Sequence, residues 1–159
     1  MTTLVLPATL DPSISNVLAT LTGSQNLSNK TLKTTKESVT ITGTAAAGTF
    51  NFDVATQAIL LYNTSSANFR INVRGNATTT LDSLLNVGES IGVCALIPNG
   101  ATAYYLLGVN IDGVAQTIKL QNGNAISAGN TNSTDMYNVF IIKTAAATYQ
   151  TFVSQTKYA

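Results

Sequence analysis

Residues 68–74 read Asn-Phe-Arg-Ile-Asn-Val-Arg, and apolar and polar side chains alternate strictly along this stretch. Successive side chains of a β-strand point to opposite faces, so Phe69, Ile71 and Val73 would share one face. The amide and cationic side chains would then take the other face, toward water. This pattern predicts a β-strand with one face on a hydrophobic core.

Similar signals recur on both sides of this stretch, from Ser38 to the C-terminus. Alternating segments and short apolar runs of strand length occupy residues 39–42, 49–54, 58–62, 91–97, 104–109, 139–142 and 148–154. Residues 81–85 are compatible with one helical turn between strands. No helix long enough for a βαβ crossover interrupts the series, so a parallel sheet is not expected.

Turn dipeptides separate several of these segments. Asn99-Gly100, after Pro98, supplies the positive φ angles of a tight hairpin between two strong strand candidates. Asp112-Gly113 and Asn122-Gly123 repeat the signal, and residues 74–76 carry a weaker version of it. About eight to ten strands at this spacing predict an all-β fold, an antiparallel β-sandwich that is jelly-roll-like.

The N-terminal part of the chain differs from the rest, so we divide the chain into residues 1–37 and a β-sandwich domain of residues 38–159. Asp11 and Pro12 could cap and open a short helix through Leu21, which Gly23 would end. A lone helix of this length is marginal in water. Residues 1–37 are therefore predicted to form an anchoring or oligomerisation segment that needs a partner surface.

The chain has unusually few charges. Charged residues make up 9% of the 159 residues, against about 25% in an average soluble domain, and the formal net charge is +1. Lys30, Lys33 and Lys36 are spaced like a solvated segment rather than a phosphate-binding stripe, so nucleic acid is not an expected partner. A chain with little self-repulsion is suited to an assembly in which much of its surface is covered.

The sequence offers little material for catalysis. Histidine is absent and Cys94 is the single cysteine, which excludes His-dependent triads, zinc sites and an intrachain disulfide. Cys94 is expected to be a small buried residue of a strand. The seven acids form no recognisable pair for glycoside cleavage, and they are Asp11, Glu37, Asp53, Asp82, Glu89, Asp112 and Asp135. We predict no enzyme activity, no catalytic residue, no cofactor and no metal; calcium held by Asp112, Asp135 and loop carbonyls is the weaker alternative.

Carbohydrate recognition is a second possibility. Residues 123–134 form a long loop of small polar residues that is expected to be exposed. Tyrosine rings could stack on sugars, although packing at strand edges is the more common role, and the six are Tyr62, Tyr104, Tyr105, Tyr137, Tyr149 and Tyr158. Four glycosylation sequons, at Asn29, Asn63, Asn76 and Asn132, are expected by chance in so Asn- and Thr-rich a chain.

Targeting signals are not expected either. The first residues lack a basic stretch followed by a long apolar run, and no window approaches the roughly 18 apolar residues that span a bilayer. Membrane insertion is therefore not predicted. A protein of this kind working outside cells would leave them by lysis, as the parts of a virion do.

Two stretches resemble proteins of phage particles. Residues 26–32, Asn-Leu-Ser-Asn-Lys-Thr-Leu, resemble a short element of phage tail-fibre and virion surface proteins, where it commonly precedes a trimeric β region. The chain from about Phe50 onward resembles a domain recurrent in structural proteins of marine cyanophages. The matching pieces are residues 68–75, 86–90, 103–105, 135–144 and 152–159.

The resemblance implies a non-enzymatic virion protein on the particle surface, usually a homotrimer in contact with capsid or tail proteins. It could be a fibre or tail appendage or a capsid decoration (cement) protein; the alternative is a carbohydrate-binding module that recognises a host receptor. The short segment before the β domain argues against a complete fibre. Phe50, Phe52 and the Tyr104–Tyr105 edge are the apolar surfaces that contacts between protomers could bury.

Overall fold

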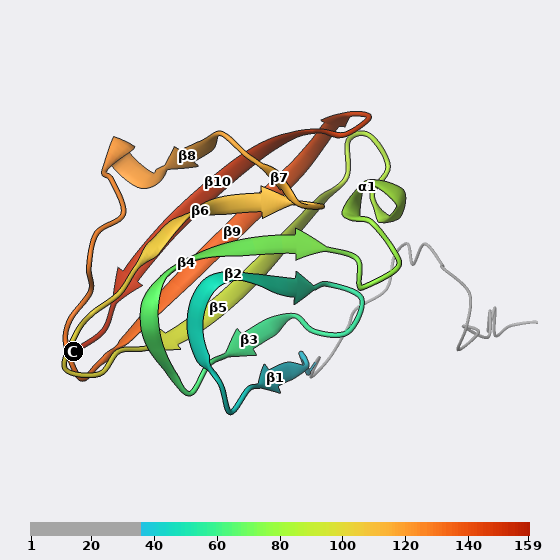
Figure 1. Ribbon diagram of the computed structural model, residues 1–159. Coiled ribbons are helices and arrows are strands. Elements are labelled where there is room, and N and C mark those ends of the chain that lie inside the picture. The colour runs from blue at the N-terminus through green and yellow to red at the C-terminus, as the bar shows by residue number, and fades with distance from the viewer. Residues whose placement is uncertain (1–35) are drawn as a thin grey trace, which may run out of the picture. The chain divides into compact units, whose positions relative to one another are not determined.

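A computed structural model describes residues 36–159, which form two β-sheets packed on one another (Figure 1). Ten strands are present in this part of the chain, so the predicted all-β sandwich and its strand number are confirmed. The predictions for Asp11 to Gly23, Lys30, Lys33 and the tail-fibre-like element at residues 26–32 lie outside the described residues.

The larger sheet has six strands and the smaller has four. In spatial order, the six-stranded sheet contains β1 (Val39–Ile41), β3 (Ile59–Leu61), β5 (Ser90–Pro98), β9 (Thr134–Ala145), β10 (Thr148–Lys157) and β8 (Ile118–Leu120). The four-stranded sheet contains β2 (Ala45–Asp53), β4 (Thr64–Arg74), β6 (Leu106–Ile111) and β7 (Val114–Ala115). Two short helical segments complete the described chain, α1 (Leu81–Leu84) and η1 (Gln121–Gly123).

The strand pairing corrects the prediction of an antiparallel, jelly-roll-like sandwich. Of the eight strand pairs in the described part, five are parallel and three are antiparallel. From β1 to β6 the chain changes sheet at every step, so β1, β3 and β5 become parallel neighbours and so do β2, β4 and β6. A parallel pair needs a crossover, which is usually a helix. Here a strand of the opposite sheet is the crossover, and the absence of helices did not exclude parallel pairing.

The turn dipeptides behave in different ways. Asp112 and Gly113 have φ angles of 49° and 85° and join β6 to β7, which confirms a hairpin at this dipeptide. Asn122 and Gly123 also have positive φ, but they lie in η1 and not in a hairpin.

The hairpin predicted at Asn99-Gly100 is wrong, because the chain passes there from β5 in one sheet toward β6 in the other. Asn99 is buried, and its Oδ1 accepts hydrogen bonds from Ser65 Oγ at 2.7 Å and from the Tyr104 N–H at 3.3 Å. This side chain therefore joins the two layers instead of closing a turn.

The core fills the space between the sheets. Phe69, Ile71 and Val73 of β4 are fully buried, which confirms the alternation from which the β prediction began. Phe50 and Phe52 of β2 are buried as well, so the expectation that they would contact another protomer is wrong. The ring of Phe69 lies 5.6 Å from that of Phe50 and 5.5 Å, edge-on, from that of Tyr137, measured between centroids.

A polar network closes one end of the sandwich around the predicted helical turn, which is α1. The Asp112 carboxylate accepts hydrogen bonds from the backbone N–H groups of Leu81 and Asp82 at 2.8 and 3.1 Å. The Lys143 ammonium forms a 2.8 Å ion pair with Asp82 and donates to the carbonyl of Leu85 at 3.0 Å. Because these groups come from β6–β7, α1 and β9, the network fixes the helix over the end of the core.

Candidate functional site

The outer face of the six-stranded sheet is apolar and lies on the side away from the second sheet. In β9, Tyr137, Val139 and Ile141 point into the core and are buried. The alternate side chains point outward, and among them Phe140 is 45% exposed. The same strand thus supplies both the core and an apolar outer surface.

Two phenylalanines stand side by side on this face. Phe140 of β9 and Phe152 of β10 are directly paired across the two strands and are 45% and 36% exposed. The Lys119 ammonium of β8 lies 5.3 Å from the centre of the Phe152 ring and donates a 2.7 Å hydrogen bond to Gln150. The cation therefore borders the aromatic pair on one side.

Aliphatic side chains continue the face over β1, β3 and β5. The register places Val39, Ile59 and Cys94 in one row across the strands. A second row contains Ile41 and Leu61, together with Leu96. Val39 is 45% and Ile41 73% exposed, so the apolar surface reaches the edge strand.

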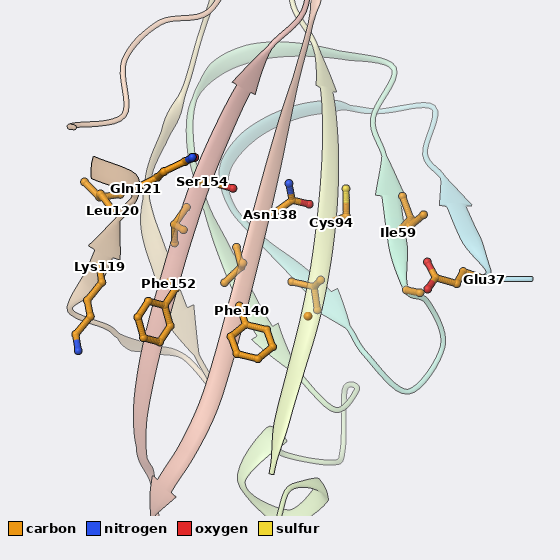
Figure 2. Close-up of a pocket in the computed structure, with 15 residues that line it drawn as sticks. Glu37, Ile59, Cys94, Lys119, Leu120, Gln121, Asn138, Phe140, Phe152 and Ser154 are labelled. Atoms are coloured by element: carbon orange, nitrogen blue, oxygen red, sulfur yellow. The ribbon is translucent and has the colours of Figure 1, made fainter. Parts of the chain in front are cut away.

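A groove of about 560 Å³ runs across the middle of this face (Figure 2). Its lining comes from β3, β5, β8, β9 and β10, and includes both phenylalanines. Polar groups from Asn138, Ser154 and Gln121 lie in the row beside the phenylalanines. The groove therefore combines an apolar floor with a small set of hydrogen-bonding groups.

The charges of the groove lie at opposite sides. Figure 2 shows Glu37 beside β3 at one margin and Lys119 on β8 at the other, with Phe140 and Phe152 between them. Both groups line the groove; the sequence analysis considered Glu37 only as one of the seven acids and did not name Lys119. Neither carries a motif, because only the sheet order brings the start of the described chain and β8 to the two sides of one surface.

Cys94 lies in this groove rather than in the core. It is half-buried on the outer side of β5, while its neighbours Val93 and Ala95 point inward, so the prediction of a buried strand residue needs correction. Partial burial raises the pKa of its thiol, and the negative charge of Glu37 raises it further. The thiol is therefore held in its protonated form at neutral pH.

The structure distributes the predicted acids among separate roles. Asp53 pairs with Arg74 at 2.7 Å, and Glu89 accepts hydrogen bonds from the backbone and side chain of Asn86. Asp82 and Asp112 hold α1 in place. Asp11 lies outside the described residues. Within residues 36–159, no three His, Cys, Asp or Glu side chains gather closely enough to hold a metal ion.

The calcium alternative fails on geometry because its two acids are not brought together. Asp112 contacts α1, which the far end of β9 also contacts through Lys143. Asp135 lies at the opposite end of β9, fully buried, where its Oδ2 accepts hydrogen bonds from Tyr137 at 3.1 Å and Gln155 at 3.0 Å.

The loop at residues 123–134 is largely exposed, as predicted, and is tied to β10. Gln155 donates to the carbonyl of Ser127, and Lys157 to that of Ala128, both at 2.8 Å. The tyrosines do not form an exposed platform: Tyr62 and Tyr137 are buried, Tyr104, Tyr105 and Tyr149 are half-buried, and Tyr158 is exposed.

Comparisons of the chain with protein-family models, with curated proteins and with solved structures find no match in any of the three. Within the described part of the chain, no helix is long and apolar enough to cross a membrane.

Proposed function

We propose that this chain is a non-enzymatic structural protein of a phage particle, displayed on the virion surface as a tail or fibre appendage or as a capsid decoration protein. The observation that carries the proposal is the largely apolar outer face of the six-stranded sheet, which no other part of residues 36–159 covers. A large exposed surface that is mostly apolar and contains a few polar groups is typical of a site for protein association.

The resemblance to phage structural proteins supports the same role. Its longest pieces correspond to β4, to most of β9 and to the second half of β10, which are strands of the sandwich. The homotrimer and the contacts with capsid or tail proteins that the resemblance implies belong to this proposal. A cyclic trimer needs a head-to-tail contact between unlike surfaces.

The use of the charged groups is also consistent with a structural role. Arg74, Asp53, Lys143 and Asp82 form two ion pairs, and Asp112 binds the N-terminus of α1. In each case the charge joins one element of the sandwich to another. These carboxylates are therefore engaged in holding the fold rather than facing a common cleft.

Mass spectrometry and immunogold electron microscopy of purified particles test the proposal. In the phage that encodes the chain, we expect the protein in many copies per particle and the gold label on the outer surface. The double variant Phe140→Ser/Phe152→Ser should fold but be lost from particles. Leu107→Ser, which removes a comparably exposed apolar side chain from the other sheet, serves as the matched control. A protein absent from purified particles would overturn the proposal.

A second candidate, recognition of a host glycan, is favoured by the composition of the groove. Phe140 and Phe152 offer two adjacent ring faces, and Asn138, Ser154 and Lys119 place hydrogen-bonding groups beside them. Stacking faces with a few polar groups suit a sugar. A glycan array compares Phe152→Ala with a shortened 124–133 loop. Binding lost only in the former would place the sugar in the groove, binding lost only in the latter would place it at the loop, and an array without hits would remove this candidate.

A further inference from the structure

We propose that the occupant of the outer face is a second copy of this chain, packed sheet against sheet about a two-fold axis that runs along the strands. The inference rests on the proposed function, because it names the first partner that such an assembly protein would take. Two twisted sheets pack well face to face, with side chains interdigitating between them. The arguments are the shape of the face and the position of its charges.

In the row that contains Phe140 and Phe152, the face is raised over β9 and β10 and hollow over β5. Phe140 and Phe152 stand on β9 and β10, whereas Gly92 of β5 and Ala58, next to β3, line the same groove with almost no side chain. A methyl group at Gly92 would meet the Phe140 ring at 3.8 Å and no other neighbour within 4 Å. A two-fold axis between β5 and β9 therefore places the phenylalanines of each copy over the hollow of the other.

The charges select this axis over the other possible one. Glu37 and Lys119 lie at opposite margins of the groove (Figure 2). A two-fold axis along the strands exchanges the two margins, so that each Glu37 faces the Lys119 of the other copy. A two-fold axis across the strands would instead place like charges over one another. Because the contact is isologous, the favourable pair forms twice.

Charge reversal in the chain of 159 residues tests which residues face each other across the proposed dimer contact. Sedimentation equilibrium should show a species of two chains at micromolar concentrations, against a chain mass of 16.6 kDa. Exposed ion pairs contribute modestly, and reversing one partner of two such pairs should weaken dimerisation about tenfold in Glu37→Lys and in Lys119→Glu. An equimolar mixture of the two variants should restore the dimer, since each variant then supplies what the other lacks.

Filling the hollow and removing the phenylalanines test the packing. Gly92→Leu should leave the fold intact, because its Cβ would make only an ordinary contact with the Phe140 ring and the side chain would enter the groove, and it should block the dimer. Phe140→Ser/Phe152→Ser should also be monomeric, whereas Leu107→Ser should dimerise like the parent chain. Melting temperatures near that of the parent would show that the variants still fold.

Cys94 supplies a second readout, because it is the single cysteine and lines the groove. Its alkylation rate should fall as protein concentration rises through the dimerisation range, and Phe140→Ser/Phe152→Ser should remove this dependence. A parent chain that stays monomeric, forms a trimer, or dimerises unaffected by Gly92→Leu and by both charge reversals would overturn the dimer. A two-chain species would contradict the homotrimer that the proposed function includes, but none of these results bears on whether the protein is found in particles, so the virion role fails or stands separately.

Discussion

Both faces of the six-stranded sheet carry apolar side chains, but in the described part of the chain only the inner face is covered, by the four-stranded sheet. On the inner face, Tyr137, Val139 and Ile141 of β9 pack against the four-stranded sheet and are at most 1% exposed. On the outer face, Phe140 and Phe152 are 45% and 36% exposed. Apolar side chains alone therefore do not make a core in this protein; a second layer and closed ends are also required.

The α1 end of the interior is closed by polar groups that are themselves paired. Lys143 is 6% exposed, and its ammonium bonds to the carboxylate of Asp82 and to the Leu85 carbonyl. Among the described residues, the outer face has no comparable closure: its charged groups, Glu37 and Lys119, lie at the margins of an open groove. The inner face is thus covered and closed by residues of the same chain, whereas the outer face is suited to contact with a partner.

The largest expected effect is truncation of an inner-face aromatic residue. Phe69→Ala should lower the free energy of unfolding by about 3–5 kcal/mol, because it removes a fully buried ring in contact with Phe50 and Tyr137. Phe140→Ala, measured at a concentration where the chain is monomeric, should change it by less than about 0.5 kcal/mol. Urea denaturation of the two variants measures both values. Equal losses of unfolding free energy would mean that Phe140 contributes as much to the fold as the fully buried Phe69.

Next in size is removal of the buried cation that closes the interior. Lys143→Met keeps most of the apolar stem but leaves the Leu85 carbonyl without its donor and the Asp82 carboxylate without its cation. The expected loss of unfolding free energy is about 1–3 kcal/mol. Lys119→Met on the outer face is the matched control and should cost less than about 0.5 kcal/mol. A Lys143 variant as stable as the control would show that the network contributes nothing to closing the core.

The strand pattern of the inner face could be read from the sequence wherever side chains alternate. Residues 69, 71 and 73 alternate with polar neighbours, and their burial follows directly. Residues 91–97 are almost continuously apolar, so nothing local shows that Cys94 faces outward and Ala95 inward. The outer face could not be predicted for the same reason, because Phe140 of β9 lies in the equally continuous apolar run at residues 139–142.

Strand order and turns were predictable only where local backbone preference decides them. Asp112-Gly113 is a hairpin because two positive φ angles suffice. The β9–β10 hairpin has no such signal: Ala147 has a φ of 48°, and its N–H donates to Asp82 at 2.7 Å. A tertiary contact from a distant helix therefore stabilises this turn. The parallel pairing arises in the same way, from the order in which strands enter the two sheets.

A smaller effect is expected at the Asp112 carboxylate, which binds the first N–H groups of α1. Asp112→Asn keeps a residue that tolerates positive φ and retains one acceptor oxygen, so it should cost about 1 kcal/mol or less. Asp112→Ala also strains the turn at a φ of 49° and should cost about 1–2 kcal/mol more. Thermal unfolding of the two variants separates the helix contact from the turn. If both lose the same stability, the turn conformation is not a factor.

The smallest expected effect is the pH dependence that comes from Asp82. The hydrogen bond from Lys143, followed by that from the Ala147 N–H, lowers the pKa of this carboxyl below its ordinary value. A lowered pKa in the folded state means stability that is present above the unfolded pKa of about 3.9 and lost as the pH falls through the folded pKa. The side chain is 37% exposed, so solvent screens the effect.

The melting temperatures of the parent chain and Asp82→Asn should therefore differ most near neutral pH and converge in acid. Introducing Asp82→Asn into a Lys143→Met background repeats the comparison without the main cause of the lowered pKa, so the effect of the substitution should depend less on pH there. An unchanged pH dependence would show that Lys143 does not stabilise the Asp82 carboxylate. The closed end of the inner face would then depend on the Asp112 contact with α1 and on the Lys143 hydrogen bond to the Leu85 carbonyl, without a contribution from the ion pair.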